Sequence, residues 1–292
     1  MDIVRFRGGL GNQMFQYAFM EALKYRGREV FASIGSIKDG NIKKRFILKE
    51  VFSNIQIMEI EENVFNEINQ QWRNIKKDAE RLRIFKENIK ERFFYVEEQD
   101  SKYDEKVFDT TNCTFVGYWQ TENYFLDIKQ EIEKSFTFNI DDIELQKFAD
   151  KLQYEFFSIH VRGGDYLDSP FNEIYGGICT KKYYQKAIKF IKFRVPNAKF
   201  IIFSDELDVK KRGIEESRDI TIFNKNKFAN YQDWYDMYLM TKCRGNIIAN
   251  SSFSWWGAWL NQNPNKIIVA PKLWLNNKKT PDIWCDGWNR IG

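Results

Sequence analysis

Three short motifs in this sequence combine the residue types that bind phosphate groups. They are Gly8–Gln13 (GGLGNQ), His160–Tyr166 (HVRGGDY) and Asn250–Gly257 (NSSFSWWG). Glycines let backbone N–H groups come close to a phosphate, a guanidinium group neutralises its charge, and serines at a helix start donate to its oxygens. Together the motifs predict a site for a small ligand that carries a phosphate or diphosphate group.

The first motif predicts a turn between a strand and a helix. Gly9 and Gly11 allow close approach of a ligand, and Asn12 and Gln13 add polar side chains at the helix start. A tight turn needs glycine without any ligand, and the full spacing of a dinucleotide or P-loop motif is absent. Alone, the glycines favour a structural turn, and the polar pair shifts the interpretation toward binding.

The second motif contains the best candidate for binding a diphosphate. Arg162 can bind phosphate oxygens in a bidentate manner, which an ammonium group does less well. A surface arginine paired with Asp165 is the alternative. His160 is the only histidine in the chain. It could act as a general base, contact a nucleotide or only end a strand, and its place in the motif favours binding over proton transfer.

The third motif predicts a helix that begins with hydroxyl groups. Asn250, Ser252, Phe253 and Ser254 suit both helix capping and the binding of phosphate oxygens, although capping alone needs only one serine. The tryptophans that follow, at positions 255, 256 and 259, are interpreted mainly as helix core and not as a sugar platform.

The elements that position these motifs alternate between strands and helices. Strands are expected at 3–7, 29–34, 156–161, 199–204, 219–223, 246–249 and 266–270, and helices at 12–26, 181–194, 233–242 and 253–261. This order predicts an α/β fold with mostly parallel sheets and a ligand crevice at the carboxyl ends of the strands. The polar clusters, including Ser204-Asp205-Glu206, fall at those ends.

Composition narrows the classes of protein. The 292 residues can form one large core or two modest ones, and the net charge of +4, from 45 basic and 41 acidic residues, gives weak support for a nucleic-acid partner. The four cysteines are widely spaced, which favours a cytoplasmic location. We expect no export signal and no membrane span, and leave peripheral attachment to a membrane open.

Some expected ligands of metals are absent from the sequence. No Asp-x-Asp motif is present to hold a divalent cation on a diphosphate, and one histidine with scattered cysteines does not predict a zinc site. We therefore expect no metal and no cofactor. Arginine, serine and backbone N–H groups would then stabilise a leaving diphosphate.

Five motifs in order resemble the inverting α-1,2-fucosyltransferases, a family that includes bacterial enzymes and the animal blood-group H enzymes. They are GGLGNQMFQYAF (8–19), GYWQTENYF (117–125), HVRGGDY (160–166), FSDE (203–206) and DMYLMTKCRGNIIANSSFSWWGAWL (236–260). The resemblance extends from one end of the chain to the other.

The resemblance implies a fold, a reaction and its substrates. Two Rossmann-like halves of the GT-B type would enclose the donor site in the cleft between them, with residues 1–150 on the acceptor side and 151–292 binding the nucleotide sugar. The reaction would move L-fucose from GDP-β-L-fucose to the 2-hydroxyl of a terminal β-galactoside, with inversion and without metal. Such an enzyme would serve glycan or O-antigen biosynthesis.

The resemblance also implies roles for single residues. Arg162 would neutralise the diphosphate, and His160 with Asp205 or Glu206 would contact guanine or ribose. Asp165 would orient Arg162 or its loop, and it is a weak candidate for the base that takes the acceptor proton. Phosphate oxygens would be bound through Ser252, Phe253 and Ser254, and Asn12 with Gly11 would close the site.

One position departs from the family pattern, in which two adjacent arginines follow the histidine. Here Gly163 follows Arg162. Arg5 and Arg7 alternate onto one face of the first strand, and we hypothesise that Arg7 supplies the missing charge at the donor site. The rival functions are a fucosyltransferase of another linkage and a nucleotide-sugar or glycan binding protein without catalysis.

Overall fold

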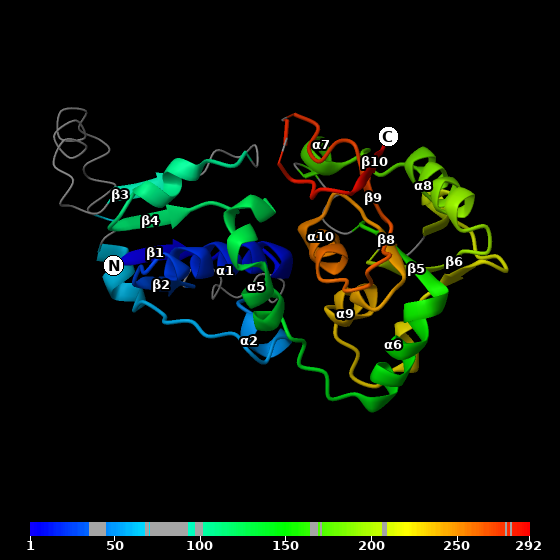
Figure 1. Ribbon diagram of the computed structural model, residues 1–292, viewed down its shortest axis with the longest axis horizontal. Helices are drawn as coiled ribbons and strands as arrows, with labels where there is room; N and C mark the ends of the chain where they lie inside the picture. The colour runs from blue at the N-terminus through cyan, green and yellow to red at the C-terminus, as the bar shows by residue number, and fades with distance from the viewer. Residues whose placement is uncertain are drawn as a thin grey trace. The chain divides into compact units, whose positions relative to one another are not determined.

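The computed structural model describes the chain except for residues 35–44, 68–69, 71–92, 97–101, 164–168, 170, 206–208, 278 and 281. The described residues form two compact units, Met1–Thr137 and Phe138–Gly292 (Figure 1). We expected a boundary at residue 150, which falls inside helix α6 (Ile143–Glu155). Leu145, Ala149 and Leu152 of α6 are buried in a core of the second unit, so the whole helix belongs there.

The first unit is built on a parallel sheet with strand order β2-β1-β4-β3. Its strands are β1 (Asp2–Arg5), β2 (Val30–Ser33), β3 (Phe93–Val96) and β4 (Cys113–Val116). Its helices are α1 (Leu10–Tyr25), α2 (Leu48–Val51), α5 (Lys129–Ser135) and the short 3₁₀ turns η3 (Glu105–Asp109), η4 (Glu122–Tyr124) and η5 (Leu126–Ile128). The charge-dense sequence from residue 61 to 91 suggests exposed helices, and most of this range lies outside the described residues.

The strand, glycine turn and helix expected at the start of the chain are present. Met14, Phe15, Ala18 and Phe19 recur at helical spacing along α1 and are fully buried. The helix ends before Gly27, whose φ of +76° is a backbone conformation that glycine adopts without steric cost. The spacing of apolar residues along the sequence therefore predicts helix α1.

Trp119 follows β4 and anchors an aromatic core in the first unit. Its ring stacks on that of Phe19 with a centroid separation of 4.1 Å and an angle of 9°, and Tyr124 meets it edge-on at 5.5 Å. Trp119 has a φ of +58°, a conformation that a bulky residue adopts only when its surroundings hold it there. Burial among aromatic rings supplies that constraint.

The second unit contains a six-stranded parallel sheet of order β10-β9-β8-β5-β6-β7. The strands are β5 (Phe156–Val161), β6 (Lys199–Ser204), β7 (Ile220–Ile222), β8 (Gly245–Ile247), β9 (Ile268–Pro271) and β10 (Asn289–Ile291). Besides α6, its helices are α7 (Phe171–Tyr175), α8 (Lys181–Arg194), α9 (Tyr235–Thr241), α10 (Ser252–Trp259) and the 3₁₀ turns η7 (Val209–Arg212) and η8 (Lys225–Lys227).

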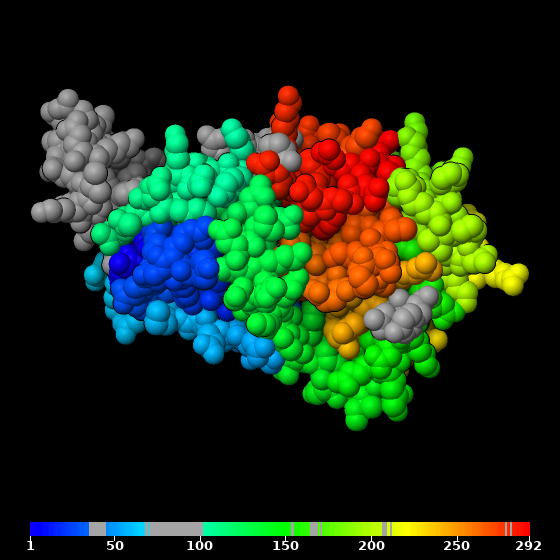
Figure 2. Space-filling view, in the orientation of Figure 1, coloured from blue at the N-terminus to red at the C-terminus, as the bar shows by residue number. Residues whose placement is uncertain are grey.

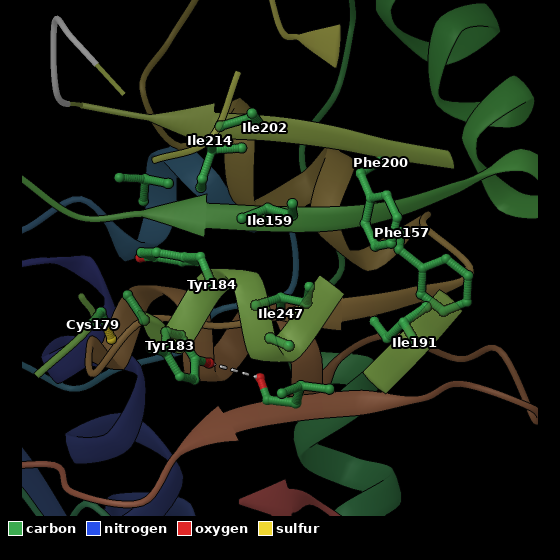
Figure 3. Packing of buried hydrophobic residues seen from close by; sticks show 14 of the residues in the cluster. Phe157, Ile159, Cys179, Tyr183, Tyr184, Ile191, Phe200, Ile202, Ile214 and Ile247 are labelled. Carbon is green, nitrogen blue, oxygen red and sulfur yellow. Dashed lines mark hydrogen bonds between the residues drawn. The ribbon is translucent and has the colours of Figure 1, made fainter. Parts of the chain in front are cut away.

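Alternate residues of β5 and β6 belong to two different cores, one on each face of this sheet. Ile159 and Ile202 face α8, where Tyr183 and Tyr184 fill the space between helix and strands (Figure 3). Ile201 lies on the other face, in the core formed with α6 and α9. Since side chains alternate along a strand, this arrangement puts His160 on the face opposite Ile159.

In each sheet, the chain adds strands on one side of a central point and then adds the others on the opposite side. In the first unit this point lies between β1 and β4, and in the second between β5 and β8. Ligands of open parallel sheets bind at the carboxyl ends of the strands beside such a point. The glycine motif follows β1, HVRGGDY begins within β5, and NSSFSWWG follows β8, so all three motifs lie at these two points.

Among the described residues, no helix combines the length and the apolar character required to cross a bilayer.

Candidate functional site

The register of the second sheet brings two of the predicted clusters together. Val161 pairs with Ser204, and Ile159 pairs with Ile247. Arg162 and Asp205, the residues that follow β5 and β6, are therefore neighbours at the carboxyl edge. The segment that follows β8 lies on the other side of β5.

Asp205 holds Arg162 in place. One carboxylate oxygen accepts a hydrogen bond from Arg162 Nη1, and the other accepts one from the backbone N–H of Gly163 at 2.7 Å. The two side chains are 30% and 34% exposed, so the ion pair itself contributes little stability. Its consequence is to orient the guanidinium at the edge of the sheet. We expected Asp165 to pair with Arg162, but Asp165 lies outside the described residues.

His160 is buried at 4% exposure, and its ring lies 5.5 Å from that of Phe253. Burial lowers the pKa of His160 to about 4; the charge of Asp205 opposes the shift and that of Arg162 adds to it. Among the described residues, its Nδ1 has no hydrogen-bond partner. A neutral imidazole with an unpaired nitrogen suits binding and is a poor general base near neutral pH.

The loop that joins β8 to α10 is held by its own polar side chains. Asn250 Nδ2 donates to the carbonyl oxygens of Tyr175 and Trp274 at 3.0 and 3.1 Å. The buried Ser254 hydroxyl is shared between the carbonyl oxygens of Ala249 and Ser251, both at 3.1 Å. These bonds shape the loop, and the expected contacts of Asn250 and Ser254 with the donor stay predictions.

Ser252 and Phe253 form the half-buried first turn of α10. The first N–H groups of a helix lack acceptors within it, so this turn can donate to an anion. Behind it, Trp255 and Trp256 are fully buried and Trp259 is 4% exposed. The interpretation of these rings as helix core is confirmed.

The glycine turn of the first unit is organised by two glutamines of α1. Gln13 is fully buried; its Nε2 donates to the carbonyl oxygens of Gly8 and Arg45, and its Oε1 accepts from Ile47 N–H. Gln16 Oε1 accepts from Arg7 N–H at 2.9 Å. These hydrogen bonds fix the turn and the chain near Ile47, and the expected contact of Gln13 with the donor stays a prediction.

The remaining polar groups of the turn face the end of β4. Gln120 Nε2 donates to Asn12 Oδ1 at 2.7 Å, and the Arg7 guanidinium lies 4.3 Å from the centre of the Tyr118 ring. Gly9 is exposed and Gly11 is buried. Arg7 as a donor ligand stays a prediction. Tyr118 and Gln120 belong to the GYWQTENYF motif, although we did not single them out from the sequence.

A pocket of about 130 Å³ opens at the carboxyl edge of the second sheet. The residues of its wall that matter chemically are Arg162, Asn172, Tyr175, Cys179, Arg212 and Asn250. Of these, Arg212 was not a sequence candidate, because it belongs to no motif and lies in a run of basic residues, Lys210-Lys211-Arg212.

Asp236 is a second residue of interest that the sequence analysis did not single out. It is 7% exposed, accepts a hydrogen bond of 2.6 Å from the Tyr231 hydroxyl, and burial raises its pKa to about 7. The sequence feature that could have identified Asp236 is its place at the start of the DMYLMTKC motif. Glu206, the neighbour of Asp205 that we also named, lies outside the described residues.

In the part of the chain that the structure describes, no three His, Cys, Asp or Glu side chains lie close enough together to hold a metal ion. The expectation of a metal-free site stays a prediction.

Two parallel Rossmann-like α/β units, with polar motifs at their switch points, define the GT-B-like class of nucleotide-binding proteins. All 292 residues match the family described as glycosyl transferase family 11, and the chain belongs to this family. It is therefore a glycosyltransferase of a fucosyltransferase family. The predicted family and fold class are confirmed.

The relatives of this chain include bacterial and animal transferases. An alpha-1,2-colitosyltransferase of Escherichia coli is 31% identical over 99% of this chain and 98% of its own length. The galactoside alpha-(1,2)-fucosyltransferase 2 of Gorilla gorilla gorilla is 27% identical over 58% of this chain and 49% of its own length. A mutant of Arabidopsis thaliana FUT1 in complex with GDP superposes with a TM-score of 0.50 at 11% identity, covering 89% of this chain and 68% of that one, and this likeness concerns the fold alone.

Proposed function

We propose that the protein transfers L-fucose from GDP-β-L-fucose to the 2-hydroxyl of a terminal β-galactoside, with inversion and without a metal. The observation that carries this proposal is Arg162, oriented by Asp205 at the β5–β8 switch point in a chain of glycosyl transferase family 11. A guanidinium there is suited to the charge that grows on a departing diphosphate.

The proposed reaction is an in-line displacement at the anomeric carbon through an oxocarbenium-like transition state. As the bond to GDP breaks, negative charge accumulates on the β-phosphate. Arg162 and the first turn of α10 offer positive charge and N–H donors to that oxygen, so they bind the transition state more tightly than the ground state. A carboxylate would take the proton of the acceptor hydroxyl, and Asp165 remains our candidate.

In this proposal, His160 and Asp205 contact the base and the ribose of the donor. His160 is neutral near pH 7 because burial lowers its pKa to about 4, so it can hydrogen-bond to a nucleotide without adding charge. The acceptor galactoside is assigned to the first unit, where Tyr118 and Gln120 offer an aromatic ring and an amide at the end of β4. Sugars bind to such surfaces through ring stacking and hydrogen bonds.

The relatives leave two donors to be compared. One is named a colitosyltransferase and another a fucosyltransferase. Colitose is L-fucose without its 3-hydroxyl, so a site that hydrogen-bonds this hydroxyl would reject GDP-colitose strongly. A site that leaves room for the 3-hydroxyl but does not hydrogen-bond to it would accept both sugars.

A donor and acceptor screen tests the proposal. GDP-fucose, GDP-colitose and GDP-mannose are incubated with lactose or with no acceptor, and GDP release and the product linkage are measured. We expect lactose-dependent GDP release from GDP-fucose and an α-1,2 product. A different linkage would identify the nearest rival, and tight GDP-fucose binding without turnover would identify the non-catalytic binding protein.

The proposed location is the cytoplasm, with attachment to the inner face of the membrane as an open alternative. No disulfide forms among the four cysteines, of which Cys113, Cys179 and Cys243 are buried. Unpaired cysteines are usual in a reducing compartment, which supports the proposal.

A further inference from the structure

The pocket at the carboxyl edge of the second sheet contains two arginines from different elements. Arg162 follows β5, and Arg212 ends the turn η7, which comes after β6. The side chains of the described wall include amides, a phenol and a thiol but no carboxylate. Asp205, which is not part of the wall, pairs with Arg162, and the two guanidinium groups together still make this pocket suited to an anion.

The fold fixes the position of Arg212 from both sides. Val209 and Ile214, which flank it, are 5% and 1% exposed and belong to the core beneath α8. Between them Gly213 has a φ of +66°, and a Cβ there would lie 2.3 Å from Cγ of Lys181. The positive φ favours glycine at this position, where the chain turns against the Lys181 side chain at the start of α8. The turn therefore presents Arg212 at a defined place in the pocket wall.

The charge of Arg212 reaches the inner wall of the pocket. The pKa of Cys179 is raised to about 12, because burial outweighs the opposing effects of Asn250 and of the Arg212 charge. Cys179 Sγ donates to Asn250 Oδ1 at 3.4 Å, so thiol and amide form one side of the pocket. Arg212 thus acts on the same space that Arg162 borders.

The size of the pocket limits what can enter it. A volume of about 130 Å³ is well below the roughly 300 Å³ at which pockets for whole drug-sized ligands begin. Phosphate groups fit such a space, whereas a nucleoside does not. A ligand that places its phosphates here must extend out of the pocket with its remaining parts.

We propose that Arg212 binds the diphosphate of the donor together with Arg162. This assignment rests on the proposed function, and it names the second cation of the donor site. Gly163 offers no side chain next to Arg162, and Arg212 brings the second guanidinium into the same pocket from another element. Two arginines bind a diphosphate through several charge-assisted hydrogen bonds.

Binding of GDP, GMP and guanosine to Arg212→Ala tests this role. The matched control is Lys210→Ala, which removes one positive charge from the same turn at an exposed position. We expect Arg212→Ala to weaken GDP binding at least tenfold and to leave guanosine binding unchanged, because only the phosphate contacts are lost. Lys210→Ala is expected to bind all three ligands like the wild type. Arg212→Gln, which removes the charge but keeps a polar side chain with three carbons, replaces the alanine variant if that one does not fold.

The outcomes separate this proposal from the proposed function. If Arg162→Ala loses GDP affinity while Arg212→Ala and Arg212→Gln keep it, Arg212 is not a phosphate ligand and the proposed function stands. Equal losses of GDP and guanosine affinity in both Arg212 variants would assign the residue to the fold and overturn the proposal. A wild-type protein that binds no GDP would refute the proposed function itself.

Discussion

At the scale of single residues, Asp205 organises the candidate site. It accepts hydrogen bonds from Arg162 and from the backbone N–H of Gly163. Its negative charge also raises the pKa of His160, which burial lowers. The backbone N–H after Arg162 helps to position the carboxylate, a contact that any residue except proline could make. Removing Asp205 would disturb three groups at once.

Replacing Arg162 by alanine should abolish most transfer activity and preserve the fold. The side chain is 30% exposed and lies at the sheet edge, so its loss leaves no cavity in the core. Loss of one group that stabilises transition-state charge typically costs about 10² to 10³ in kcat. Steady-state kinetics and circular dichroism measure the two quantities. A folded variant with near-normal rates would refute the assignment.

His160 predicts a pH dependence of stability. Its folded pKa of about 4 lies below its ordinary value of 6.5, so between these values the unfolded chain binds a proton that the folded chain does not. This contribution to stability is complete above pH 6.5 and is lost as the pH falls toward 4, by on the order of 3 kcal/mol. Chemical denaturation of the wild type and His160→Gln between pH 4.5 and 7.5 checks it. Parallel curves for the two proteins would contradict the prediction.

At the scale of elements, two turns at strand ends are built differently. The loop before α10 is closed by its own side chains, Asn250 and Ser254, whereas the glycine turn before α1 is closed by Gln13. In both turns, side chains that we expected to bind the ligand donate hydrogen bonds to backbone carbonyl oxygens. The motifs predicted polar segments at the strand ends, and the role of each side chain in donor binding stays a prediction.

Replacement by alanine should lower stability at one of the two adjacent glycines of the first turn and leave it unchanged at the other. Gly8 has a φ of +81°, and a Cβ there would lie 2.5 Å from Asn12 Nδ2, so Gly8→Ala should cost about 1 to 2 kcal/mol of stability. Gly9 has a φ of −76° and open space around it. Gly9→Ala should leave the free energy of unfolding unchanged and weaken GDP-fucose binding if the donor approaches this turn. Calorimetric unfolding and donor titration distinguish the two effects, and unchanged donor binding in Gly9→Ala would remove this turn from the site.

Helix α8 has a basic outer face that suits an anionic membrane surface. Its sequence contains five lysines and one arginine but no acidic residue, and its exposed positions include Lys182, Lys189 and Phe193, the last at 84% exposure. The helix lies at the molecular surface, yellow-green in Figure 2. Each lysine near an anionic bilayer contributes about 1 kcal/mol of binding free energy.

Sedimentation with phosphatidylserine vesicles tests this face. We expect binding that decreases with salt and is lost in Lys182→Glu/Lys189→Glu, while Lys102→Glu/Lys106→Glu, an equal charge change at exposed positions of the first unit, retains it. Equal losses in both double variants would mean that net charge and not α8 is responsible. No binding by the wild type would remove the membrane as a partner.

At the scale of the whole molecule, donor binding should stabilise the protein without metal. Arg162 and Arg212 supply the positive charge in our proposals, so GDP at a hundred times its Kd should add about 2.7 kcal/mol to the free energy of unfolding. Thermal unfolding with GDP, in the presence of EDTA or of Mg²⁺, measures this effect. We expect equal shifts, and a shift that requires Mg²⁺ would show that the donor site uses a cation.

The sequence predicted more of the second unit than of the first. Strands β5 and β6 have the expected bounds, because continuous apolar runs between turn residues mark buried parallel strands. Strand β3 was not expected, and the boundary between the units was placed inside α6. Apolar positions of α6 are equally compatible with either neighbour, and only packing against Ile201 and Phe203 decides which unit it joins.

The sequence by itself determined the family, the alternation of strands and helices, and the three segments that reach the carboxyl edges of the sheets. These features depend on residue type and local spacing, which can be read along the chain. The tertiary structure decided that Asp205 pairs with Arg162, that Gln13 is buried in the fold, and that Arg212 borders the same pocket as Arg162. Such contacts depend on strand register and on packing between distant segments, which no local pattern specifies.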